Sequence, residues 1–220
     1  MNGGAEAAIS VLGTSALLFE APGEMTLRTQ QHIWSLAREA ETWPEVREAV
    51  PGMNNLMLSW RRAPARLDEF ETRLLEAWAG IEPLALQGRV VELDVVYGGE
   101  GGPHLADVVA HTGLGVDEIV ERHSAPVYPV YALGSHPGYC YLGGMDPRIA
   151  TPRRKVPVLR IPGGAVSIGG AQTGVSASDG PSGWNTIGCT SMSFFDPLAD
   201  PPALLAPGDG LRFRVKKVIR

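Results

Sequence analysis

Two histidines stand beside residues that could take part in nucleophilic or acid–base chemistry. His123 precedes Ser124 at the end of an expected helix, and a His–Ser pair is typical of nucleophilic catalysis. Adjacency in sequence does not place the imidazole on the hydroxyl, and the chain has no Gly-x-Ser-x-Gly motif. Capping of the C-terminus of that helix is therefore the favoured alternative for His123. His136 lies among loop-forming residues, where we expect an exposed pocket position. We take His123 and His136 as catalytic candidates.

A glycine-rich segment at residues 169–174, with the sequence Gly-Gly-Ala-Gln-Thr-Gly, offers polar groups between glycines. Glycine lets the main chain approach a ligand, while the amide of Gln172 and the hydroxyl of Thr173 supply donors and acceptors. We take Gln172 as a catalytic candidate and Thr173 as a substrate-binding candidate. A simple hairpin turn is the alternative interpretation of this segment.

Two more segments have the composition of a pocket for a small polar ligand. Residues 179–185 combine a carboxylate, small residues and an indole, although Trp184 could equally belong to the core. Arg153 and Arg154 would suit a carboxylate or a phosphate, and a solvated face is the alternative for them. The catalytic candidate here is Asp179, and the substrate-binding candidates are Trp184, Arg153 and Arg154. Tyr139, in the same loop as His136, is a further substrate-binding candidate.

Composition restricts the kinds of partner and cofactor. The 220 residues hold 19 Lys and Arg against 24 Asp and Glu, a net charge of −5, which gives no general attraction to nucleic acid or anionic lipid. The two cysteines stand in no zinc-binding spacing, so we expect no metal. No apolar run reaches the ~18 residues of a membrane helix, and the N-terminus lacks a basic leader. We therefore expect a cytoplasmic protein.

The glycine run at residues 98–102 precedes an expected helix, an arrangement that can hold an anion. It lacks the lysine of a phosphate loop and the spacing of a dinucleotide fold. A turn is therefore the favoured interpretation, and an anion site stays open as the alternative.

Hydrophobic periodicity indicates an α+β protein in two parts. Residues 1–87 read as strand, strand, helix, strand, strand and helix, with helices from Thr26 to Pro44 and from Leu67 to Trp78. Residues 88–220 contain two short helices, then a region rich in glycine and proline with short β-branched stretches. Such a region favours a β-barrel or sandwich with long functional loops.

Several motifs in a fixed order resemble a known family. They are His123-Ser124, Pro137 to Arg148 (PGYCYLGGMDPR), Thr151 to Arg154, Gly169 to Gly174, and Gly183 to Gly188 (GWNTIG). Further likeness lies at Pro51 to Asn55, Val95 to Pro103, Phe195 to Pro197 and Pro207 to Asp209. Together they resemble the PxpB/KipI family, variously called the B subunit of 5-oxoprolinase, allophanate hydrolase subunit 1 or kinase A inhibitor.

The resemblance implies a small N-terminal α+β (ferredoxin-like) domain followed by a C-terminal cyclophilin-like β-barrel that carries the site. It implies an ATP-dependent enzyme that opens 5-oxoproline to glutamate. The partners would be a second cyclophilin-like subunit (PxpC, allophanate hydrolase subunit 2) and a LamB/YcsF-type subunit (PxpA). On this hypothesis Gln172→Ala abolishes turnover and leaves the complex assembled. Action on allophanate or a urea-derived amide, and inhibition of a sensor histidine kinase, are the alternatives.

The chain departs from the family pattern at positions that bear on the substrate. Ser135, Tyr139 and Cys140 stand where family members commonly have Phe, Phe and Pro. Ser176 and Ser178 replace an aromatic residue and a leucine, and Cys189 replaces an arginine. If that arginine holds an acidic group of the ligand, its loss removes a charge-assisted contact of ~1.5–3 kcal/mol.

Overall fold

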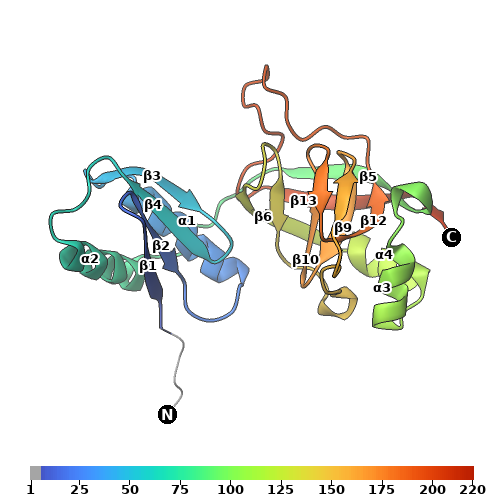
Figure 1. The fold of residues 1–220 in the computed structure, drawn as a ribbon, viewed down its shortest axis with the longest axis horizontal. Coiled ribbons are helices and arrows are strands. Elements are labelled where there is room, and N and C mark those ends of the chain that lie inside the picture. Colours follow the sequence, from blue (N-terminus) through green and yellow to red (C-terminus); the bar gives the residue numbers. More distant parts are fainter. Residues whose placement is uncertain (1–5) are drawn as a thin grey trace, which may run out of the picture. The chain divides into compact units, whose positions relative to one another are not determined.

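The computed structural model describes residues 6–220, and Figure 1 traces them. Residues 1–5, on which the expectation about a leader depends, lie outside the described part. The chain divides into two compact units between residues 86 and 87. Along the described residues, no helix has both the length and the apolar character needed to cross a membrane.

The N-terminal unit is a four-stranded antiparallel sheet covered by two helices. Its elements are β1 (Ala8–Leu12), β2 (Ala16–Glu20), α1 (Leu27–Ala40), β3 (Val46–Pro51), β4 (Asn55–Trp60) and α2 (Leu67–Gly80). Thr26 caps α1, since its side chain accepts a hydrogen bond from the Thr29 N–H. Ile33 of α1 and Leu74 of α2 pack with the sheet residues Leu17 and Leu58. The helix and strand positions expected from periodicity are therefore confirmed.

The finer expectation of a ferredoxin-like domain is not established by this chain order. A ferredoxin-like βαββαβ chain continues into another strand after its second helix. Here the strand order is β1-β2-β4-β3, so the edge strand β1 comes from the hairpin before α1. Within residues 6–220, no strand after α2 joins this sheet.

The C-terminal unit is a closed seven-stranded barrel, as expected. Its strands are β5 (Val90–Gly98), β6 (Val127–Leu133), β7 (Cys140–Leu142), β9 (Ala165–Gly169), β10 (Gln172–Val175), β12 (Asn185–Cys189) and β13 (Gly210–Ile219). They close in the order β10-β7-β6-β13-β5-β12-β9, and β5 and β13 run parallel. Helices α3 (Leu105–Thr112) and α4 (Val116–Ser124) and the short helices η1 (Gly99–Gly101) and η2 (Pro147–Ile149) complete it. A separate ribbon pairs β8 (Val158–Ile161) with β11 (Gly180–Ser182).

Two segments that carry candidate site residues are partly strands, and the hairpin that the sequence left open as an alternative for residues 169–174 is present. The glycine-rich segment at 169–174 is the β9–β10 hairpin, and residues 180–189 form β11 and β12. Single strands this short carry little periodicity of their own. Pairing with partner strands is what makes them strands, and for β12 these partners, β9 and β5, are distant in sequence.

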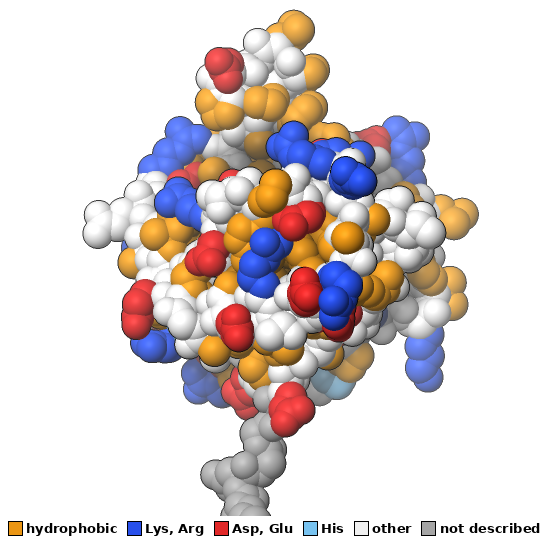
Figure 2. All heavy atoms as spheres, turned by 90° about the vertical axis from the view of Figure 1, so that its left-hand side faces the viewer, with side chains coloured by type: hydrophobic (Ala, Val, Ile, Leu, Met, Phe, Trp, Pro, Cys, Tyr) orange, Lys and Arg blue, Asp and Glu red, His pale blue; other side chains and the backbone are white. Residues whose placement is uncertain are grey.

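Surface charge is mixed, in keeping with the small net charge of the chain. Acidic and basic side chains are interspersed with hydrophobic ones on the face shown in Figure 2. The N-terminal unit has exposed ion pairs, such as Arg66 with Asp68 and Arg47 with Glu48. Such pairs contribute little stability, but opposite charges at close range leave no extended field of one sign.

Candidate functional site

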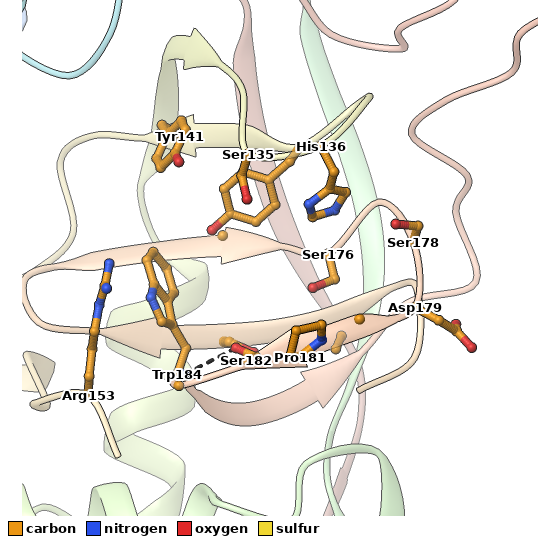
Figure 3. Close-up of a pocket in the computed structure, with 16 residues that line it drawn as sticks. Ser135, His136, Tyr141, Arg153, Ser176, Ser178, Asp179, Pro181, Ser182 and Trp184 are labelled. Carbon is orange, nitrogen blue, oxygen red and sulfur yellow. Dashed lines mark hydrogen bonds between the residues drawn. The ribbon is translucent and has the colours of Figure 1, made fainter. Parts of the chain in front are cut away.

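A polar pocket of about 570 Å³ lies on the outer face of the barrel wall formed by β9 and β10 (Figure 3). The 134–139 loop and residues 176–184 cover it. The lining residues are Ser135, His136, Tyr139, Tyr141, Arg153, Ala165, Ser167, Gly174, Ser176, Ser178, Asp179, Gly180, Pro181, Ser182, Gly183 and Trp184. Three sequence segments that are far apart along the chain therefore meet in one cavity.

Strand alternation explains why β9 is buried on both faces. Val166 and Ile168 point into the barrel core, and the alternate residues Ala165 and Ser167 line the pocket. The Ser167 hydroxyl donates to Thr186 Oγ1 of the neighbouring strand β12 at 3.2 Å. One strand thus supplies both the core and the floor of the pocket.

Two glycines of the 169–174 motif make room for aromatic side chains. A Cβ at Gly169 would overlap the indole ring of Trp184, and a Cβ at Gly174 would meet the Tyr139 hydroxyl. Glycine is needed here for close approach. The motif therefore serves the pocket by admitting two aromatic rings onto the sheet.

Arg153 is held at the pocket by the backbone on both sides of it. The Arg154 N–H donates to the Gly183 carbonyl at 2.7 Å, and the Asn185 side chain donates to the Pro152 carbonyl at 2.9 Å. The guanidinium carbon of Arg153 lies 5.7 Å from the centroid of the Trp184 ring. These contacts place a cation on the indole at one end of the pocket (Figure 3).

Successive side chains of this segment point in different directions, so Arg154 leaves the pocket. Its guanidinium pairs with Asp107 of α3 at 2.5 Å and is not among the lining groups. Of the two arginines expected to bind substrate, Arg153 lines this cavity and Arg154 does not.

His136 lines the pocket as a neutral hydrogen-bond donor. Its Nε2 accepts a hydrogen bond from the Ala177 N–H at 3.3 Å. Burial lowers the pKa of His136 below its ordinary value of 6.5. Because Nε2 is an acceptor in this neutral ring, the proton is on Nδ1. Its ring centroid lies 5.1 Å from that of Tyr139.

Asp179 lies at the rim, and its carboxylate is already occupied. Oδ1 accepts from the Gly163 N–H at 2.9 Å, and Oδ2 accepts from Arg160 at 2.7 Å. These two contacts, the Gly163 N–H first and then Arg160, hold the pKa of Asp179 below its ordinary value. The carboxylate is thus an ionised anchor for the loop, a state that does not suit a proton donor.

His123 and Thr173 lie in the barrel core, outside the pocket. Both are fully buried. His123 Nδ1 lies 2.8 Å from the Tyr97 hydroxyl, and His123 Nε2 lies 2.8 Å from Thr173 Oγ1. The Thr173 hydroxyl donates to the Ser167 carbonyl, so it accepts from His123 Nε2–H. Desolvation lowers the pKa of His123 to about 3.

The structure therefore places the catalytic candidate His123 in the core, away from this pocket. Both ring nitrogens have hydrogen-bond partners inside the core, and the low pKa favours the neutral imidazole. The position at the end of α4 was expected, whereas its complete burial was not. Gln172, on β10 beside Thr173, is half-buried and likewise not among the lining residues.

Sequence reasoning missed Tyr141 and Ser167 as lining residues, whereas Ser182 lies in the segment 179–185 that it had singled out. A usable signal existed for Ser167, because it is a lone polar residue in the apolar stretch Ala165–Ile168. Four of the positions that depart from the family pattern, Ser135, Tyr139, Ser176 and Ser178, also line the cavity. Cys140 is buried in the core, and the Cys189 sulfur faces Gly101, so neither is a lining residue.

The glycine run at residues 98–102 is a structural turn. Added Cβ atoms at Gly98, Gly101 and Gly102 would clash with the Ile219 carbonyl, the Cys189 sulfur and the Ile187 carbonyl. Its glycines serve close packing against β12 and β13. The turn interpretation fits this geometry.

Comparisons with known proteins agree with one another. Residues 7–205 match the model of the family described as carboxyltransferase domain, subdomain C and D. The protein of Escherichia coli O157:H7 named as the B subunit of 5-oxoprolinase is 46% identical over 208 residues, which cover 94% of this chain and 95% of that protein. Its namesake in Haemophilus influenzae is 36% identical, over 94% of this chain and 97% of that protein.

A solved structure supports the fold alone. The urea amidolyase of Kluyveromyces lactis aligns with a TM-score of 0.81 at 15% identity, over 97% of this chain and 15% of that one. The family model and the two named relatives carry the assignment of family. This chain therefore belongs to the PxpB family, the B subunits of 5-oxoprolinase, and it matches the carboxyltransferase C and D subdomains along most of its length.

Proposed function

We propose that this protein is the B subunit of an ATP-dependent 5-oxoprolinase, which converts 5-oxoproline, ATP and water into glutamate, ADP and phosphate. The observation that carries the proposal is the 46% identity with a 5-oxoprolinase B subunit along nearly the whole length of both chains. The partners would be a second cyclophilin-like subunit of the PxpC type and a LamB/YcsF-type subunit of the PxpA type.

The reaction needs ATP because a lactam is a poor electrophile and its hydrolysis is uphill without coupling. Transfer of the terminal phosphoryl group of ATP to the lactam oxygen would make the ring carbon electrophilic. Water would then add to that carbon, and the ring C–N bond would break to release the amine and leave the acyl phosphate of glutamate. A second water would hydrolyse this acyl phosphate to glutamate and phosphate.

We assign binding, and not phosphoryl transfer, to this chain. The glycines at 98, 101 and 102 are explained by close packing against neighbouring strands, without a phosphate. We therefore place no ATP contact on these residues.

The pocket suits the binding of a small polar acid. Arg153 supplies a positive charge, His136 supplies an N–H, and Tyr139 supplies a hydroxyl. Asp179 is the sole acidic side chain among the described lining residues, and Arg160 neutralises it. A general base for the attacking water would then come from a partner subunit.

The test is phosphate release from ATP by the complex of this chain with its two partner subunits. We expect 5-oxoproline to stimulate release, with glutamate formed in equal amount, and omission of this chain to remove the stimulation. A stable complex that releases phosphate at the same rate with and without 5-oxoproline would refute the proposal. Allophanate in the same assay tests the urea-amide alternative, and a histidine kinase autophosphorylation assay tests the inhibitor alternative.

A further inference from the structure

The arginines around the pocket differ in whether their charge is already used. Arg154 pairs with Asp107, and Arg160 pairs with Asp179. Arg153 forms no salt bridge with any residue of the described chain, and its guanidinium lies over the Trp184 ring. A cation on an aromatic face keeps its N–H groups free for a planar anion.

The other polar lining groups lie away from Arg153. In Figure 3, Arg153 and Trp184 occupy one end of the cavity, while His136, Ser176 and Ser178 occupy the other. The His136 Nδ1–H and the serine hydroxyls can donate to a neutral acceptor such as a carbonyl oxygen. The cavity therefore has a charged end and a neutral, donor-rich end.

Among the described lining residues, no free negative charge competes with a bound anion. The Asp179 carboxylate is bonded to Arg160 and to the Gly163 N–H, and it lies at the rim. A ligand with one carboxylate and one carbonyl matches both ends of the cavity, because the donors at each end then have an acceptor. A ligand without the carboxylate would leave the guanidinium of Arg153 unmatched.

We propose that Arg153 is the specificity-determining residue of this pocket, where its guanidinium on Trp184 binds the carboxylate of a small carboxylate-bearing amide. This inference rests on the proposed function, from which it takes the reaction that the complex catalyses. It assigns the charge recognition to Arg153 alone, and it assigns the carbonyl to the end of the pocket formed by His136, Ser176 and Ser178.

The experiment compares two lactams in the assembled complex. 5-Oxoproline carries the carboxylate, and 2-pyrrolidinone is the same ring without it. For Arg153→Gln we expect KM for 5-oxoproline to rise about 10- to 100-fold, the size of a charge-assisted contact, with kcat within about threefold. The kinetic constants for 2-pyrrolidinone should change less than about twofold. Arg153→Lys should recover part of the KM, and Arg212→Gln, on the outer side of β13, should leave both substrates unaffected.

The outcomes separate this inference from the proposed function. If Arg153→Gln turns over 5-oxoproline with an unchanged KM, or loses equal amounts of kcat/KM for both lactams, the role of Arg153 is overturned. The proposed function still stands in that case. If 5-oxoproline does not stimulate phosphate release by the wild-type complex, the proposed function fails. Calorimetric titration of this chain with 5-oxoproline, glutamate and their amides then tests the inference by itself. The inference is supported if the wild-type chain binds the acids more tightly than their amides and Arg153→Gln loses this preference. It is overturned if the wild-type chain binds acids and amides equally.

Discussion

The indole of Trp184 lies against Gly169 so closely that a single added methyl group at residue 169 would overlap the ring. Through this contact, strand β9 packs against Trp184, the side chain whose ring lies under the Arg153 guanidinium. Gly169 thus shapes the pocket through the position of Trp184 and is not itself a lining residue.

Gly169→Ala should therefore damage the pocket more than the fold. We expect a loss of about 1–3 kcal/mol in the free energy of unfolding, the usual range for overpacking, measured by urea denaturation. Affinity for the pocket ligand should fall at least tenfold because Trp184 is displaced. Gly80→Ala is the control, since nothing lies within 4 Å of its added Cβ. Unchanged ligand affinity in Gly169→Ala would contradict this role of the glycine.

The buried His123 predicts a dependence of stability on pH. The pKa of His123 is about 3 in the folded chain and about 6.5 in the unfolded chain. Between these two pH values the imidazole is protonated in the unfolded state and neutral in the folded state. The stability contribution is complete above pH 6.5 and declines as the pH falls toward 3, by at most ~1.4 kcal/mol per pH unit. NMR should show a His123 ring that stays neutral from pH 8 to pH 5, and a ring that titrates near 6.5 would refute this.

Asp179 should behave as an ionised anchor and not as a proton carrier. Asp179→Asn keeps an acceptor for the Gly163 N–H and loses the charge opposite Arg160. Since the pKa of Asp179 is below its ordinary value, the carboxylate stays ionised through the neutral range. We expect kcat of the complex to stay within about threefold, with the same pH profile from pH 6 to 9. A loss of more than about 100-fold would identify Asp179 as an acid–base catalyst.

The Tyr139 hydroxyl lies over Gly174 and makes no hydrogen bond to another described residue. Tyr139→Phe should therefore leave the melting temperature unchanged and weaken ligand binding about three- to tenfold, the size of one neutral hydrogen bond. Parallel measurement of thermal unfolding and of KM in the complex checks this. A large loss of stability would mean that the hydroxyl is needed inside the chain.

Much of the fold could be predicted from the sequence because the signals are local. The helix from Leu27 follows from its Thr26 cap and the 3.6-residue period of its apolar side chains. The barrel followed from short β-branched stretches separated by glycine and proline, and from motifs that identify the family. These features depend on neighbours within a few residues, or on the order of motifs along the chain.

The site depended on contacts that sequence spacing does not encode. Arg153 and Arg154 are adjacent and alike, yet only the backbone bonds to Gly183 and Asn185 decide which one reaches the pocket. His123 and His136 both suited catalysis by residue type, and the packing of α4 against the barrel places His123 in the core. Burial, and the pKa that follows from it, comes from the whole fold.

What the sequence alone determined is the family, the helices, most strands and the set of polar residues from which a site could be built. Tertiary structure decided which of those residues share a cavity, because barrel closure brings β9, β10 and the 134–139 loop together across long stretches of chain. It also decided their chemistry: Asp179 is neutralised by Arg160, His136 is a neutral donor, and Arg153 keeps a free charge among the described lining residues. Charge state depends on burial and partners, and both are properties of three-dimensional packing.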